Sequence, residues 1–136
     1  MEKIDNNRYK AQLYTTSLML MVASADSNID EKELIAMEKI LIKFFNIDKS
    51  LCKELIKESY DIIDKATDIY EIGSFINKLF NNKEKTELLT CIFQIAYSDK
   101  NFHFMERHLI KKIANIMNIN KNNLLNIKNE VLRNLC

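Results

Sequence analysis

Two short acidic segments contain the residues of this chain that are best suited to binding a metal ion. Residues 25–33 read ADSNIDEKE, and residues 98–106 read SDKNFHFME. In each segment an aspartate is followed three positions later by an apolar residue and seven positions later by a glutamate. Hard cations such as Ca²⁺ take several oxygen ligands from clusters of this kind. The candidate metal ligands are Asp26, Asn28, Asp30, Glu33, Asp99 and Glu106.

The expected cation site is weak, and it is not an EF-hand. Glu31 stands where an EF-hand loop needs glycine, and Met37 stands where that loop needs a bidentate glutamate. With fewer ligands, we expect a Ca²⁺ dissociation constant on the order of 10⁻⁴–10⁻³ M. The first segment should bind more tightly, because the second is surrounded by basic residues: Lys100, Arg107, Lys111 and Lys112.

Helix capping accounts for several of the same side chains without any ligand. Asp30 can accept a hydrogen bond from the backbone N–H of Glu33, whose side chain can reach back to the Asp30 N–H. Ile29, just before this cap, can pack on Leu34. Glu106 has the equivalent place in the second segment. Capping alone and capping combined with weak cation binding are therefore both open.

The two segments belong to a longer repeat. A single offset of 73 residues also relates their flanks: Val22-Ala23 falls on Ile95-Ala96, Met37 on Ile110, Ile40 on Ile113 and Phe44 on Met117. A repeat of this length indicates a supersecondary unit that is used twice.

The elements that must position these residues are helices. The chain has no proline and one glycine, and its apolar residues recur with helical spacing, so we expect an all-α bundle without strands. One domain, 1–136, should hold repeat 1 at about 5–65, a linking helix and repeat 2 at about 83–135. The seven expected helices span about 5–25, 31–45, 49–65, 69–81, 83–98, 104–117 and 121–135.

Several residues should fix the placement of these helices. The stretch 18–23 is apolar all round, which is typical of a central buried helix. Ile40 lies on the expected core stripe of the second helix. The pattern Asp68-Ile-Tyr-Glu71 predicts a capping box, and Asn120 should cap the last helix.

Composition excludes several classes of partner. The formal net charge of +1 gives no basic field for nucleic acid. The apolar run from Leu18 to Ala25 is far shorter than the ~20 residues of a membrane span, so we expect no membrane insertion. Cys52, Cys91 and Cys136 show no CxxC spacing and are odd in number, which favours reduced thiols in a cytoplasmic protein.

No set of catalytic residues can be assembled from the sequence. His103 and His108 do not share a helical face, and neither belongs to a zinc or di-iron motif. Cys52 and Cys91 lie on apolar faces and should be small core residues. Without convergent acid, base and nucleophile residues, we expect a protein that is not an enzyme.

Both acidic segments resemble the A-D-G-x-[IL]-x-x-x-E signature of the TerB-like family, which includes tellurite-resistance proteins and the N-terminal domain of the DjlA co-chaperone. The resemblance implies a seven-helix fold and an acidic surface proposed to bind divalent metal. The signature aspartate corresponds to Asp26 and Asp99, and its glutamate to Glu33 and Glu106. Its glycine is replaced by Ser27 in one copy and by Lys100 in the other.

The expected function is that of a non-enzymatic cytoplasmic interaction module with a role in stress response, such as tellurite resistance. Its partners should be proteins, and its only expected cofactor is a weakly bound divalent cation, with Ca²⁺ favoured. Two alternatives stay open: a secreted or envelope-associated effector with the same helical fold, and a metal-dependent enzyme.

Overall fold

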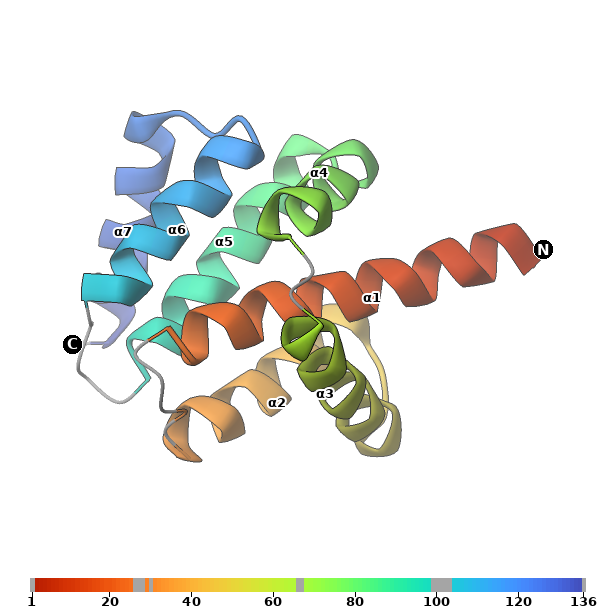
Figure 1. The fold of residues 1–136 in the computed structure, drawn as a ribbon. Coiled ribbons are helices and arrows are strands. Elements are labelled where there is room, and N and C mark those ends of the chain that lie inside the picture. The colour runs from red at the N-terminus through yellow and green to blue at the C-terminus, as the bar shows by residue number, and fades with distance from the viewer. Residues whose placement is uncertain (1, 26–28, 30, 66–67, 99–103, 136) are drawn as a thin grey trace.

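The computed structural model describes residues 2–25, 29, 31–65, 68–98 and 104–135. These residues form seven α-helices and no strand (Figure 1). The all-α prediction is confirmed, and the largest difference in a helix boundary is at the N-terminus, where the first helix begins at Glu2 instead of about residue 5. The helices are α1 (Glu2–Ala23), α2 (Glu31–Phe45), α3 (Lys49–Asp64), α4 (Ile69–Leu79), α5 (Asn82–Ala96), α6 (Phe104–Ile116) and α7 (Lys121–Leu135).

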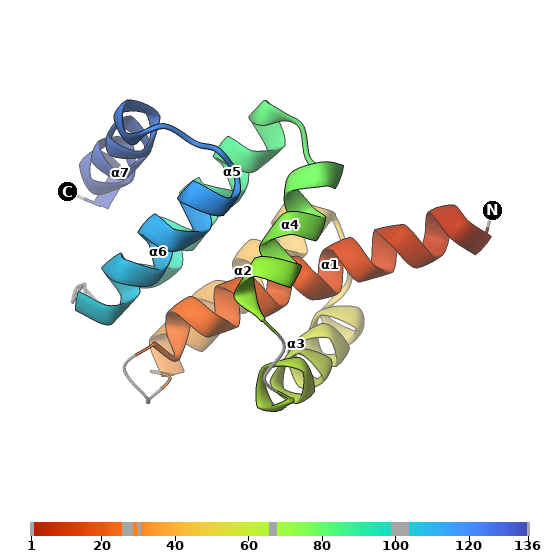
Figure 2. The same ribbon diagram turned by 45° about the horizontal axis from the view of Figure 1, so that its top comes forward.

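Helix α1 is the centre of the molecule, in contact with every helix from α2 to α6 (Figures 1 and 2). Its C-terminal half supplies the largest continuous part of the core, as the apolar stretch predicted. Ile40 is half-buried and packs against this core from α2. The fully buried residues of the α1 stretch are Leu18, Met19, Leu20, Val22 and Ala23.

The two halves of the chain make corresponding contacts. Helix α1 packs on α2 and α3, and α5 packs on α6 and α7. The halves also exchange helices, because α2 packs on α5 while α6 packs on α1. The repeat seen in the sequence is therefore a structural repeat, with α1–α3 corresponding to α5–α7.

Helix α4 joins the halves and packs against α1 and α6. The single glycine of the chain, Gly73, is buried on α4. A Cβ atom at this position would lie 2.8 Å from Cγ2 of Ile116 on α6. Close approach of α4 to α6 therefore explains a glycine in the middle of a helix, where it costs ~1 kcal/mol relative to alanine.

The second helix of each half ends in the same way. Asn46 and Asn118 have positive φ angles of 53° and 59°. The residue after each donates its backbone N–H to the carbonyl five positions earlier, at 3.2 Å for Ile47 and 2.9 Å for Ile119. This is the Schellman ending, which requires one residue in the left-handed conformation. Asparagine adopts that conformation more readily than most other residues.

These endings correct the alignment of the halves. Asn46 and Asn118 are 72 positions apart, whereas the acidic segments are 73 apart, so the stretch from the glutamate to this asparagine is one residue shorter in the second half. The following N-caps keep the offset of 72: Asp48 Oδ1 accepts from Leu51 at 2.8 Å, and Asn120 Oδ1 accepts from Asn123 at 2.8 Å. The pairing of Phe44 with Met117 was therefore wrong, and Phe45 corresponds to Met117.

The predicted cap at Asp68 is present in a different form. Its Oδ1 accepts from the backbone N–H of Tyr70 at 3.0 Å, one position earlier than the capping-box pattern implied. The cap predicted at Asn120 is confirmed by its bond to Asn123.

Candidate functional site

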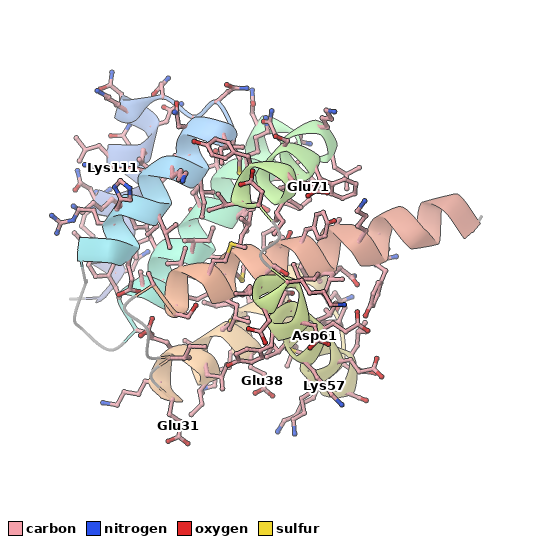
Figure 3. All side chains as sticks on the ribbon, in the orientation of Figure 1. Glu31, Glu38, Lys57, Asp61, Glu71 and Lys111 are labelled. Carbon is pink, nitrogen blue, oxygen red and sulfur yellow. The ribbon has the colours of Figure 1, made fainter. Side chains whose placement is uncertain are left out.

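Glu33 and Glu106 are the two candidate metal ligands that lie in the described part of the chain, and both are buried. Each is the third residue of its helix, α2 or α6. Their side chains are 1% and 0% exposed, and the Oε2 atom of each lies in the interior. In contrast, the nearby Glu31 is exposed, and Figure 3 shows its side chain pointing away from the helices. The structure thus buries the same acidic residue twice, once in each half.

A third glutamate shows what capping alone requires. Glu84 is also the third residue of its helix, α5, and forms a complete capping box with Asn81. The Asn81 N–H donates to Glu84 Oε1 at 2.9 Å, and the Glu84 N–H donates to Asn81 Oδ1 at 2.8 Å. This box works at the surface, with Glu84 exposed. Capping therefore does not account for the burial of Glu33 and Glu106.

Burial makes the charge of these two carboxylates costly. Moving an ionised carboxylate out of water costs several kcal/mol unless positive charge or hydrogen bonds offset it. The N-terminal end of a helix supplies part of that offset, through its backbone N–H groups and dipole. A bound cation would supply more, and carboxylate oxygens are the ligands that Ca²⁺ and Mg²⁺ prefer.

The chain enters both acidic segments with the same backbone geometry. The Ala25 N–H donates to the Val22 carbonyl at 3.2 Å, and the Ser98 N–H donates to the Ile95 carbonyl at 3.1 Å. These pairs are related by the offset of 73. The C-terminal ends of α1 and α5 and the N-terminal ends of α2 and α6 all lie on the same side of the molecule (Figures 1 and 2).

The other predicted ligands lie outside the described residues: Asp26, Asn28, Asp30 and Asp99. Within the described residues, no group of three or more His, Cys, Asp or Glu side chains could hold a metal ion. The complete ligand set therefore stays a prediction. Ile29, predicted to pack beside the first cap, is half-buried against the core.

The described cysteines are not activated for nucleophilic chemistry. Burial, reinforced by the charge of Glu38, raises the pKa of the Cys52 thiol to about 11. Burial, reinforced by Glu87, raises the pKa of Cys91 to about 11 as well. Reactive cysteines have lowered pKa values instead. Cys52 is fully buried, as predicted, whereas Cys91 is half-buried and His108 is exposed.

A large groove between α6 and α7 was not predicted from the sequence. It has a volume of about 1010 Å³, and Tyr70 of α4 and Phe93 of α5 also line it. Arg107, Lys111 and Lys112, which the sequence only placed near the second acidic segment, are part of its wall. The signal that could have revealed it is the clustering of basic residues on α6 and α7.

Comparison with known proteins identifies one family. The model of the family described as "Tellurite resistance protein TerB" matches residues 12–129, which is most of the chain. Neither the curated proteins nor the solved structures include a match. In the part of the chain that the structure covers, no helix is long and apolar enough to cross a membrane.

Proposed function

The chain belongs to the TerB family, and from this premise we propose that it is a non-enzymatic cytoplasmic interaction module whose two acidic segments bind a divalent cation. Its physiological role would be in stress response. The observation that carries the proposal is the burial of Glu33 and Glu106 at equivalent positions. Two buried carboxylates in one small domain indicate a purpose beyond helix capping, because the same cap works at the surface in α5.

In this proposal each glutamate is the inner ligand of a separate site. Glu33 would act with Asp26, Asn28 and Asp30, and Glu106 would act with Asp99. The cation would offset the buried charge and hold the turn between two helices, so its role is structural or regulatory. Ca²⁺ suits these ligands best, because it accepts flexible oxygen coordination.

The chemistry of the described side chains supports a role without catalysis. The Cys52 and Cys91 thiols are held in the protonated form by burial. His108 is the one histidine in the described part of the chain, and it is exposed on α6. A TerB-type module would then act through the surfaces that it presents to other proteins.

A thermal-shift experiment with matched variants tests the cation. At a tenfold excess of Ca²⁺ over its dissociation constant, binding should stabilise the wild-type fold by about 1.4 kcal/mol. For a domain of this size that corresponds to a rise in melting temperature of roughly 3–6 °C. Glu33→Gln and Glu106→Gln should each reduce this rise, since the amide keeps the shape of the side chain but removes its charge.

Glu84→Gln is the control, because it changes the same helix position in α5 outside both segments. It should lower stability by less than about 1 kcal/mol and leave the calcium-dependent rise unchanged. If wild-type protein shows no rise with millimolar Ca²⁺, Mg²⁺, Mn²⁺ or Zn²⁺, the cation proposal is wrong.

A further inference from the structure

The groove between α6 and α7 combines an apolar floor with a basic rim. The floor comes from α5, α6, α7 and the turn between α6 and α7. Its apolar residues are Phe93, Ile110, Ala114, Ile119 and Leu124. Leu125 and Tyr70 also line the groove and are 54% and 52% exposed, which is high for large apolar side chains. A surface of this kind is typical of a site that buries apolar groups of a partner.

All the charged side chains among the described residues that line the groove are basic. Five Lys and Arg side chains line it, together with His108, and no Asp or Glu does. The whole chain has a net charge of only +1, so this concentration is local. The five cationic residues are Arg107, Lys111, Lys112, Lys121 and Lys128, and Lys111 on α6 is labelled in Figure 3.

In the N-terminal half the corresponding helices pack together. Helices α2 and α3 are in direct contact, and the Cys52 thiol of α3 lies 3.6 Å from the Glu38 carbonyl oxygen of α2. Helices α6 and α7 make far fewer contacts with each other. The groove therefore lies where the packing of the C-terminal half differs from that of the N-terminal half.

The two halves also differ in residue type at corresponding positions. Leu34 of α2 and Ile56 of α3 are half-buried apolar residues. With the offsets of 73 and 72, their counterparts are Arg107 and Lys128. These two long cationic side chains add positive charge to the groove at positions where the first half has aliphatic side chains.

We propose that this groove binds an acidic amphipathic helix of a partner protein. The groove lies between two helices, so a third helix can lie along it with its apolar face on the floor, the helix-in-groove mode of recognition. Carboxylates on both flanks of that helix would face the lysine and arginine side chains of the rim. This complementarity would set the orientation of the helix and speed its association.

The apolar floor separates this proposal from recognition of nucleic acid. A nucleic-acid site gains most of its affinity from phosphate contacts and does not need several aliphatic side chains at its centre. A flat membrane surface would contact the rim without filling the concave floor. The inference rests on the proposed interaction role, whose partner chemistry it specifies, and it does not depend on the cation.

The test uses a fluorescent synthetic peptide as the probe. Its sequence places leucine at positions i, i+3, i+4 and i+7 along a helix and glutamate on both flanks. Binding to the full chain is measured by fluorescence anisotropy in EDTA. A scrambled peptide of identical composition, anionic lipid vesicles and single-stranded DNA are tested in parallel. We expect the amphipathic peptide to bind best, and its binding to weaken as salt is raised.

Charge reversal in the groove gives the decisive comparison. Lys111 and Lys121 are both exposed, so Lys111→Glu combined with Lys121→Glu should leave the fold intact and weaken peptide binding by roughly tenfold or more. The matched control reverses Lys39 and Lys53, which are exposed on α2 and α3 of the other half. It changes net charge by the same amount and should weaken binding by less than about twofold.

Three results would overturn the proposal: no binding of the amphipathic peptide, equal binding of the scrambled peptide, or equal weakening by both double variants. Binding of vesicles or DNA that depends on Lys111 and Lys121, without peptide binding, would also overturn it in favour of that ligand. Because EDTA is present, a negative result leaves the cation proposal to be decided by its own thermal-shift test.

Discussion

The two halves of the molecule share a backbone plan but differ in how their outer helices meet. In the N-terminal half α3 packs directly on α2, whereas in the C-terminal half α6 and α7 border a groove of about 1010 Å³. Leu34 and Ile56 occupy the positions that Arg107 and Lys128 have in the second half. The comparison shows that the outer two helices of one copy of a helical repeat can border a groove while the copy still contributes to the common core.

The halves also share a buried acidic residue. Each buries a glutamate at the third position of its second helix, Glu33 or Glu106. The third example of this helix position, Glu84, caps its helix while exposed. Both halves therefore present one candidate cation ligand at the same helix position, whereas the groove lies in the C-terminal half.

The largest effect on stability is expected from a charge placed in the core of the N-terminal half. Leu55 is fully buried on α3, so Leu55→Asp should bury an unpaired carboxylate and cost several kcal/mol. Against a total stability of ~5–15 kcal/mol, the variant should be largely unfolded or melt far below wild type. Circular dichroism during heating measures this loss.

The contrasting substitution is Leu125→Asp, at an exposed position beside the groove. Leu125 is 54% exposed beside the groove, so this change should alter stability by only about 0.5 kcal/mol. A loss of stability as large as that of Leu55→Asp would show that Leu125 is covered, which would contradict an open groove at this position.

A smaller effect is expected from the two described cysteines, one in each half. Burial raises the pKa of both Cys52 and Cys91 to about 11, so at pH 8 only about one thiol in a thousand is ionised. In a Cys136→Ser background, reaction with a disulfide reagent should be slow and should accelerate about tenfold per pH unit up to pH 10. The half-buried Cys91 should react before the fully buried Cys52, whose modification needs local opening.

A plateau in the reaction rate near pH 9 would contradict this expectation, because it would show thiols with ordinary pKa values. The raised pKa values also imply that stability contributed by the neutral thiols is present below pH 9, the usual pKa of a thiol, and is lost as the pH rises toward 11.

Much of the fold was predictable because it depends on local patterns. Helical periodicity and the near absence of breakers placed all seven helices, and the offset of 73 related the two acidic segments. The change to an offset of 72 was also visible in the sequence, where Asn46-Ile-Asp-Lys matches Asn118-Ile-Asn-Lys. It was missed because a single offset fitted the apolar residues of both helices nearly as well.

Two features could not be predicted from local patterns: the burial of Glu33 and Glu106, and the groove. A capping-box pattern is compatible with an exposed or a buried glutamate, and only the packing of α2 on α5 and of α6 on α1 decides between them. Similarly, the basic residues of α6 and α7 are evident in the sequence, but their arrangement around one groove depends on the separation of two helices.

The most direct test of the cation proposal is a calcium titration followed by amide chemical shifts in NMR spectra of the 136-residue protein. We predict saturable shifts confined to residues 25–33 and 98–106, with the first segment saturating at the lower concentration and a midpoint on the order of 10⁻⁴–10⁻³ M. Glu33→Gln should abolish the shifts of the first segment while leaving those of the second. Absence of shifts in both segments, or shifts spread over exposed carboxylates such as Glu54 and Asp61, would contradict a cation site at the paired glutamates.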